Sequence, residues 1–126
     1  MPGMRARVPT EAQEQKAIFQ WVEYARGNHP DLCMLFAIPN GGSRHPAEAR
    51  NLKLTGVRSG VPDMFLPVAR GGYHGLFIEL KRVKGSTVEP MQKVWIDALS
   101  RAGYMAVVCR GAASAIETIE EYLGMK

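Results

Sequence analysis

Apolar residues recur along the chain with two periods, which together predict alternating helices and strands. Apolar positions three and four residues apart predict helices at about 10–26, 46–55, 90–102 and 112–123. Short apolar runs predict strands at 32–39, 63–68, 75–81 and 104–109. Because helices separate most of these strands, the pattern predicts an α/β layer fold with a mixed sheet.

Residues that favour helix ends and turns support these bounds. Thr10 followed by Gln13 is typical of a capping box at the start of the first helix. Pro46 suits the first turn of the second helix, and Gly56 suits the position just after its end. The connection at 69–74 is short and contains glycine, so the strands that it joins are expected to form an antiparallel hairpin.

The last two helices each have an apolar face that we expect to be buried. On the third helix this face consists of Val94, Trp95, Ala98 and Leu99. On the last helix it consists of Ala115, Ile116, Ile119 and Leu123.

Length and composition are those of one globular domain. The chain has 126 residues, of which 46% are apolar and 22% charged, so we expect a single domain over 1–126 with a flexible extension at 1–9. No window reaches the ~18 uninterrupted apolar residues of a membrane span, and no apolar run follows the basic N-terminus. Cys33 and Cys109 lie in apolar stretches without metal-ligand spacing, which favours buried free thiols in a reducing compartment. These features predict a small, soluble, intracellular domain without a membrane partner.

The formal charge of +4 at pH 7 is unevenly distributed along the chain. Residues 111–126 contain three glutamates and one lysine, a sum of −2, so residues 1–110 carry +6. A positive field of this kind suits an anionic partner such as nucleic acid. Taken alone the charge decides little, because many proteins with this charge bind no nucleic acid.

The strand expected at 75–81 combines apolar residues with two charged ones. Alternation places Leu76, Ile78 and Leu80 on one face, and on the other Phe77, Glu79 and Lys81. Both faces begin apolar, which predicts a central strand covered on both sides, with Glu79 and Lys81 side by side and partly desolvated. The alternative is a strand that emerges into solvent, where both are ordinary surface charges.

Asp63 follows Pro62 at the mouth of the preceding strand. The short connection between the two strands allows Asp63 and Glu79 to converge, and two close carboxylates repel each other unless a cation neutralises them. Ligation by oxygen alone, without His or Cys, favours Mg²⁺ or Mn²⁺ over Zn²⁺. The alternative is that Asp63 initiates a turn and caps backbone amides.

Two further polar residues lie on the apolar sides of helices. Glu14 lies four residues before Ile18 on the core-facing stripe of the first helix, although the helix dipole also favours an acid in this first turn. Gln92 lies three residues before Trp95 on the third helix, where it could instead complete a capping box.

Pro62-Asp63, fifteen intervening residues and Glu79-Leu80-Lys81 resemble the PD-(D/E)XK nuclease signature. The surrounding sequence resembles the VRR-Nuc family in four segments, at 13–15, 38–42, 56–63 and 75–81. The resemblance continues in Gln92, Trp95 and Gly103-Tyr104, and it runs in the right order from about 10 to 123. The chain is similar to the standalone members of virus or bacterial type.

The resemblance implies a restriction-endonuclease-like three-layer fold, in which helices flank a mixed sheet, and a Mg²⁺- or Mn²⁺-dependent endonuclease that hydrolyses phosphodiester bonds in DNA. Standalone members are associated with homodimers that cut four-way (Holliday) junctions. For this chain it implies a cytoplasmic protein of a bacterial or phage-infected host cell, without a nucleotide cofactor. One active site cuts one strand, so symmetric resolution of a junction would require a homodimer.

The resemblance also implies roles for individual residues. Asp63 and Glu79 match the metal-binding acids, and Lys81 matches the catalytic lysine. We expect the backbone carbonyl of Leu80 to complete the metal site, with Glu14, which matches the first-helix acid, binding the same ion or a second one. Gln92 matches the glutamine of the third helix. One departure is Glu89, where a small hydroxyl residue would be expected before Pro90.

Contacts with DNA phosphates are expected from one loop and several basic side chains. The loop combines exposed amides with donor side chains, in Asn40, Gly41, Gly42, Ser43, Arg44 and His45. Further expected phosphate ligands are Arg58, Arg82, Lys84 and Lys93. The alternatives are a flexible turn for the loop and solvated surface charges for the basic residues.

Other functions remain open from the sequence. A restriction-like, flap or duplex endonuclease could use the same core, and a catalytically silent DNA-binding module could retain the fold. A structural partner-binding domain rests only on the acidic last helix.

Overall fold

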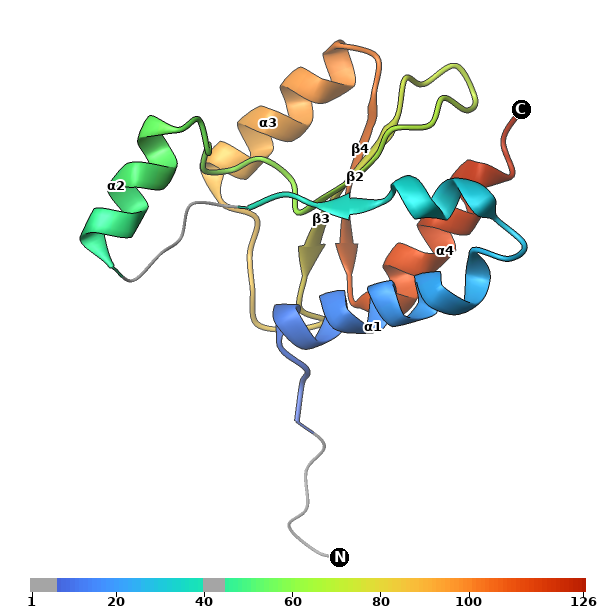
Figure 1. Cartoon of the computed structure of the whole chain (residues 1–126), viewed down its shortest axis with the longest axis horizontal. Helices are drawn as coiled ribbons and strands as arrows, with labels where there is room; N and C mark the ends of the chain where they lie inside the picture. The colour runs from blue at the N-terminus through green and yellow to red at the C-terminus, as the bar shows by residue number, and fades with distance from the viewer. Residues whose placement is uncertain (1–6, 40–44) are drawn as a thin grey trace, which may run out of the picture.

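The computed structural model describes residues 7–39 and 45–126. Its described part is a four-stranded mixed sheet with helices on both faces (Figure 1). The first half contains helix α1 (Glu11–Ala25), the 3-10 helix η1 (Pro30–Met34), strand β1 (Phe36–Ala37) and helix α2 (Pro46–Leu54). The second half contains strands β2 (Met64–Leu66) and β3 (Leu76–Lys81), helix α3 (Pro90–Arg101), strand β4 (Met105–Arg110) and helix α4 (Ala112–Leu123).

The strand order in the sheet is β1-β2-β3-β4. Strand β2 pairs antiparallel with both β1 and β3, so the expected hairpin is confirmed, whereas β4 runs parallel to β3. A parallel neighbour requires a crossover, and α3 provides it. Strand β3 therefore lies between two partners, as expected for a central strand.

The helices form layers on either side of this sheet (Figure 1). Helices α1 and α4 contact each other and cover one face, while α3 packs on the other face against β4. The main core lies beneath α1 and α4 and includes Ile18, Leu32, Met64, Leu66, Ile78, Leu80, Ala115 and Ile119. The Tyr122 hydroxyl, at the end of α4, donates a 2.6 Å hydrogen bond to the buried Val68 carbonyl. The α/β three-layer fold is thus confirmed.

Several local signals act as the sequence predicts. The Thr10 side chain accepts from the Gln13 N–H at 3.1 Å, and the Gln13 side chain accepts from the Thr10 N–H at 2.9 Å. This capping box satisfies two amides that the first turn of a helix leaves without partners. Gly56 follows the end of α2 with φ +102°, a conformation that other residues rarely adopt.

The expected strand at 32–39 is wrong for its first part, which forms the 3-10 helix η1. Leu32 and Leu35 are the buried residues of this segment. Their spacing of three suits a 3-10 helix, in which side chains three apart lie on the same side. Cys33, between them, is exposed, so the expectation of two buried thiols is correct only for Cys109.

Helix α3 is less buried than its apolar pattern predicts. Trp95 and Leu99 are partly buried, but Val94 is 55% exposed and Ala98 is also exposed. Every residue of α3 keeps at least partial exposure, because the helix packs on β4 along one narrow stripe and α2 stands away from the sheet (Figure 1). Of the helices in the described part of the chain, none has the length and apolar character needed to cross a membrane.

Candidate active site

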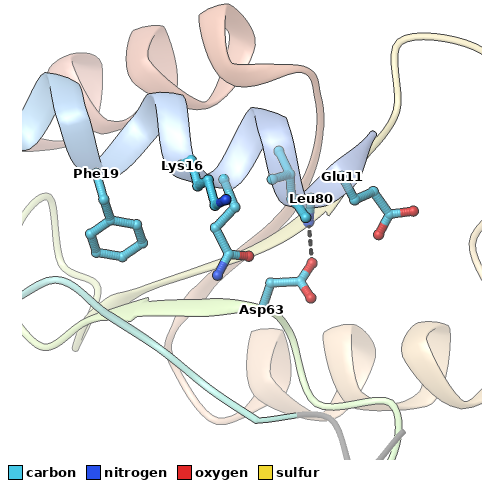
Figure 2. Close-up of a pocket in the computed structure, with 7 residues that line it drawn as sticks. Glu11, Lys16, Phe19, Asp63 and Leu80 are labelled. Atoms are coloured by element: carbon cyan, nitrogen blue, oxygen red, sulfur yellow. Dashed lines mark hydrogen bonds between the residues drawn. The ribbon is translucent and has the colours of Figure 1, made fainter. Parts of the chain in front are cut away.

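A buried proline and the first acid of the site lie just before strand β2. Pro62 is fully buried, and Asp63 immediately precedes Met64. The Asp63 carbonyl accepts a 2.8 Å hydrogen bond from the Ile38 N–H, and its side-chain Oδ2 accepts one of 2.6 Å from the Leu80 N–H (Figure 2). The main chain of Asp63 is thus tied to the β1 segment and its side chain to β3.

The register between β2 and β3 brings the two predicted metal-binding acids together. Met64 pairs with Ile78, so one further step along each strand places Asp63 beside Glu79. The alternative role of Asp63, as an acceptor for a backbone amide, is also present in its contact with Leu80. The two roles are compatible, because a carboxylate has two oxygens with several lone pairs.

Glu79 is a buried carboxyl group in an electrostatically unfavourable position. Glu79 is 1% exposed, and its Oε1 has no hydrogen-bond partner among the described residues. The pKa of Glu79 is raised from 4.5 to about 9, first by burial and then by a hydrogen bond and charge repulsion from Asp63, while the charge of Lys81 acts in the opposite direction. The carboxyl group therefore keeps its proton at neutral pH unless a cation takes the place of that proton.

Lys81 is the last residue of β3 and is only 5% exposed. It lies two residues beyond Glu79 and therefore points to the same face of the strand. Its carbonyl accepts a 2.9 Å hydrogen bond from the Gly111 N–H, which fixes the end of β3 against the start of α4. The structure thus holds the three residues of the nuclease-like signature at neighbouring positions, with Asp63 just before β2 and Glu79 and Lys81 on β3.

A cleft of about 440 Å³ lies beside these residues, between one side of α1 and the two strands. Its lining consists of Glu11, Ala12, Gln15, Lys16, Phe19, Asp63 and Leu80. Figure 2 shows Glu11 at the end of the cleft near the Asp63–Leu80 hydrogen bond, with Phe19 at the opposite end. The charge of Glu11 also contributes to the raised pKa of Glu79.

Sequence reasoning missed Glu11 as a member of this site. Glu11, Gln15 and Phe19 are spaced by four residues, so they form one side of α1, and this spacing is the signal that could have identified them.

Glu14, the first-helix acid implied by the resemblance, does not line this cleft. A Cβ atom at Gly111 would lie 2.7 Å from Glu14 Oε2, so the carboxylate occupies space left by that glycine. Gly111 has φ +90° and is the N-cap residue of α4. An acid there is favoured by the dipole of α4, which gives Glu14 a structural role in addition to the metal-binding role that the resemblance implies.

Gln92 has a structural role at the start of α3. Its side-chain Oε1 accepts a 2.8 Å hydrogen bond from the Glu89 N–H, as the capping alternative predicts. Glu89 itself occupies the N-cap position with extended backbone angles. Gln92 is partly buried and does not line the cleft beside Asp63.

Comparison with known proteins identifies the family. The family model of the VRR-NUC domain matches residues 9–113. The chain belongs to the VRR-NUC family. It is similar to a solved structure described as a VRR_NUC domain protein, with 32% sequence identity and a TM-score of 0.82 over 95% of this chain and 93% of that chain. No curated protein matches the chain. Membership of this family places the protein among nucleases.

The predicted DNA-binding residues of this VRR-NUC domain occupy different environments. Asn40, Gly41, Gly42, Ser43 and Arg44 lie outside the described residues. His45 is exposed at the N-cap position of α2, and Lys84 and Lys93 are exposed as well. Arg58 lines a second cleft between α2 and α3.

Arg82 differs from the other predicted phosphate ligands, because its guanidinium already has protein partners. Its Nε donates to the Pro9 carbonyl at 3.3 Å and its Nη2 to the Val8 carbonyl at 3.2 Å. These bonds connect the segment just after β3 to the segment just before α1. Arg82 therefore helps to hold the start of α1, and with it Glu11, near the end of β3.

The acids of the VRR-NUC site suit a hard cation but do not form a complete cage. Among residues 7–39 and 45–126, no three His, Cys, Asp or Glu side chains are grouped closely enough to hold an ion. Two carboxylates are available, and the N–H and C=O of a strand residue point to the same edge, so the Leu80 carbonyl faces the Asp63 side. A cation would satisfy the unpartnered Glu79 oxygen and offset the repulsion that raises its pKa.

Proposed function

We propose that this VRR-NUC protein is a metal-dependent DNA endonuclease that hydrolyses phosphodiester bonds and acts as a homodimer on four-way junctions. The observation that carries the proposal is the buried Glu79 carboxyl group, whose Oε1 has no partner while Asp63 and Lys81 lie beside it. Burying such a group costs stability unless another interaction compensates it. A catalytic role would explain why the chain keeps this destabilising carboxyl group.

Asp63, Glu79 and the Leu80 carbonyl would hold Mg²⁺ or Mn²⁺, since oxygen ligands of this kind suit hard divalent ions. When bound, the ion would lower the pKa of a water molecule and offset negative charge on the phosphate. The Leu80 N–H fixes one Asp63 oxygen, so the carboxylate is oriented before any ligand arrives.

Lys81 supplies the remaining acid–base chemistry. Its ammonium group lies on the same face of β3 as Glu79 and is almost fully buried, so its charge is little screened by water. From this position the ammonium group can orient the attacking water and stabilise the charge that develops on the phosphate, whereas taking up the proton of that water would require the neutral amine.

The two acids in the first turn of α1 lie in different surroundings. Glu11 lines the cleft with Asp63, whereas Glu14 lies against Gly111 at the end of β4. The family resemblance assigns the first-helix role to Glu14, and the geometry of the cleft adds Glu11 as a second candidate. Variants at the two positions separate these assignments.

The proposal of a four-way junction as the substrate rests on charge and symmetry. The first 110 residues carry a charge of +6, which suits a polyanion. The chain provides one Asp63–Glu79–Lys81 cluster, and paired cuts across a symmetric junction need two. A homodimer satisfies this requirement.

A cleavage panel tests the proposal. Single-stranded, flap, linear duplex and four-way substrates of matched sequence are incubated with Mg²⁺, with Mn²⁺ or with a chelator. We expect metal-dependent cleavage with a preference for the four-way substrate, abolished in Glu79→Ala and retained in Glu23→Ala, which alters an exposed acid of α1. Equal cutting of linear duplex would favour a restriction-like enzyme, and no cutting of any substrate would favour a silent DNA-binding module.

A further inference from the structure

A second cleft of about 440 Å³ opens between α2 and α3, away from the acids. Trp95 and Met91 of α3 form part of its wall, Lys53 comes from α2, and Arg58 and Ser59 come from the loop that follows α2. Figure 1 shows this loop running from α2 past the start of α3.

The lining combines an apolar surface with positive charge. Trp95 is partly buried, and Lys53 and Arg58 are both exposed. Among the described residues, no acid lines this cleft, and neither cation forms an ion pair. The cleft therefore presents an aromatic ring beside two cations that lack a counter-charge.

We propose that this cleft binds an unpaired nucleotide of the DNA substrate, with its base against Trp95 and its phosphate between Lys53 and Arg58. Aromatic side chains bind single-stranded bases by stacking, largely independently of sequence. Arginine and lysine neutralise the phosphates of the same strand. The inference rests on the proposed action on DNA and adds a substrate class, DNA with unpaired nucleotides near the cut.

The position of the cleft along the chain connects it with the acids. Five residue steps separate Arg58 from Asp63, which limits their Cα atoms to about 18 Å even in a fully extended chain. Gly60, within this segment, packs directly on α3, since a Cβ atom there would lie 2.8 Å from the Met91 Cβ. A strand bound at the acids can therefore reach the cleft within a few nucleotides.

Charge argues against a second copy of this protein as the occupant. A symmetric contact through this face would place the same two cations, Lys53 and Arg58, close to their equivalents in the other copy. DNA supplies the negative charge that they lack. Self-association through the cleft is nevertheless measurable and is one outcome of the test below.

Tryptophan fluorescence provides the test, because the chain has only two tryptophans, Trp21 and Trp95. In Trp21→Phe, Trp95 is the sole reporter. A short oligothymidylate is titrated in chelator, so that binding is observed without cleavage. We expect saturable quenching of Trp95, and in the same background a five- to tenfold weaker affinity for Lys53→Ala and for Arg58→Ala.

Arg50→Ala is the matched control, because Arg50 is an exposed cation on α2 that does not line the cleft. We expect its affinity to stay within twofold of the parent. An equal loss in Arg50→Ala and Lys53→Ala would indicate a diffuse positive field and would overturn the inference. Binding measured by anisotropy without any change in Trp95 fluorescence would also overturn it.

Two outcomes separate this inference from the proposed nuclease function. Quenching that depends on protein concentration without DNA would assign the cleft to a second copy and contradict a nucleotide site. Trp95 quenching by DNA in a protein that cuts no substrate would support the cleft and refute the nuclease. Cleavage without a Trp95 response would support the nuclease function and refute the nucleotide site in the cleft.

Discussion

Strand β3 has two faces that make different contributions to the molecule. On one face Leu76, Ile78 and Leu80 are at most 1% exposed and belong to the core beneath α1 and α4. The opposite face begins with Phe77, whose ring stacks on Phe65 at a centroid distance of 4.1 Å.

Beyond Phe77 this second face changes from aromatic to charged. Glu79 and Lys81 are nearly as buried as the leucines, but Glu79 lacks a partner for one oxygen. The first face thus stabilises the fold, whereas the end of the second holds ionisable groups at a cost to stability. Substitutions on the two faces separate these contributions.

The largest effect is expected for Glu79→Ala, assayed on the best substrate. Removing a carboxylate that is proposed to hold the metal should lower the cleavage rate by at least about 10³-fold, equivalent to about 4 kcal/mol of transition-state stabilisation. Thermal unfolding should show no comparable loss of stability, because the carboxyl group is buried without full compensation. A variant that cuts at the wild-type rate would exclude Glu79 from the site.

Ile78→Ala tests the other face of the same strand. Ile78 is completely buried, so its truncation should lower the free energy of unfolding by about 2–5 kcal/mol. Denaturant titration measures this change, and Val108→Ala on the neighbouring strand is a partly exposed control that should lose much less. A loss below that of the control would contradict the assignment of this face to the core.

A pH dependence should distinguish Glu79 from an ordinary surface acid. Its pKa is about 9 in the folded, metal-free protein and near 4.5 when unfolded, so between these values the folded state binds the additional proton. The free energy of unfolding should therefore fall as pH rises through this range.

Melting temperatures from pH 5 to pH 9 in chelator measure this trend, and Glu79→Gln should reduce it. Because ion binding displaces the proton, Mg²⁺ should raise the melting temperature more at pH 8.5 than at pH 6. A Mg²⁺ effect independent of pH would contradict proton displacement at Glu79.

Glu11→Gln and Glu14→Gln compare the two acids of α1. Glu11 lines the cleft with Asp63, so its neutralisation should lower the cleavage rate about tenfold with little change in stability. Glu14 lies against the start of α4, and its neutralisation should lower stability by about 0.3–1 kcal/mol. If Glu14→Gln loses more activity than Glu11→Gln, the assignment from the family resemblance is the better one.

Arg82→Ala should have the smallest effect on the cleavage rate. Loss of its bonds to the Val8 and Pro9 carbonyls should lower stability by about 1 kcal/mol and lower the cleavage rate a few-fold by loosening the start of α1. If Arg82 also bound DNA, the variant would show a shallower salt dependence of affinity, and an unchanged slope would limit it to the structural role.

The sequence predicts most of the fold and the central part of the site. The spacing of apolar residues and the capping residues locate the four α-helices of the described chain. The alternation of side chains along β3 places Glu79 and Lys81 on one face. Asp63 could be placed beside Glu79 because a short hairpin restricts the register of its strands.

Other features depend on contacts that a local pattern does not contain. Glu11 and Glu14 are three residues apart on one helix, and only the position of α1 over the sheet decides which of them faces Asp63. The 3-10 helix at Pro30–Met34 was missed because a short apolar run fits a strand equally well. The exposure of Val94 depends on which side of α3 packs against β4, which periodicity does not indicate.

The tight contact at Gly60 has a mechanical consequence. A Cβ atom at this position would overlap the Met91 Cβ and backbone carbonyl, and φ is +90°, so a side chain at residue 60 would force α3 outward. Only Val61 and Pro62 separate Gly60 from Asp63, and Pro62 is fully buried. The first turn of α3 and the carboxylate of Asp63 are therefore coupled through a short, stiff segment, so a displacement of that helix would be transmitted to the acid.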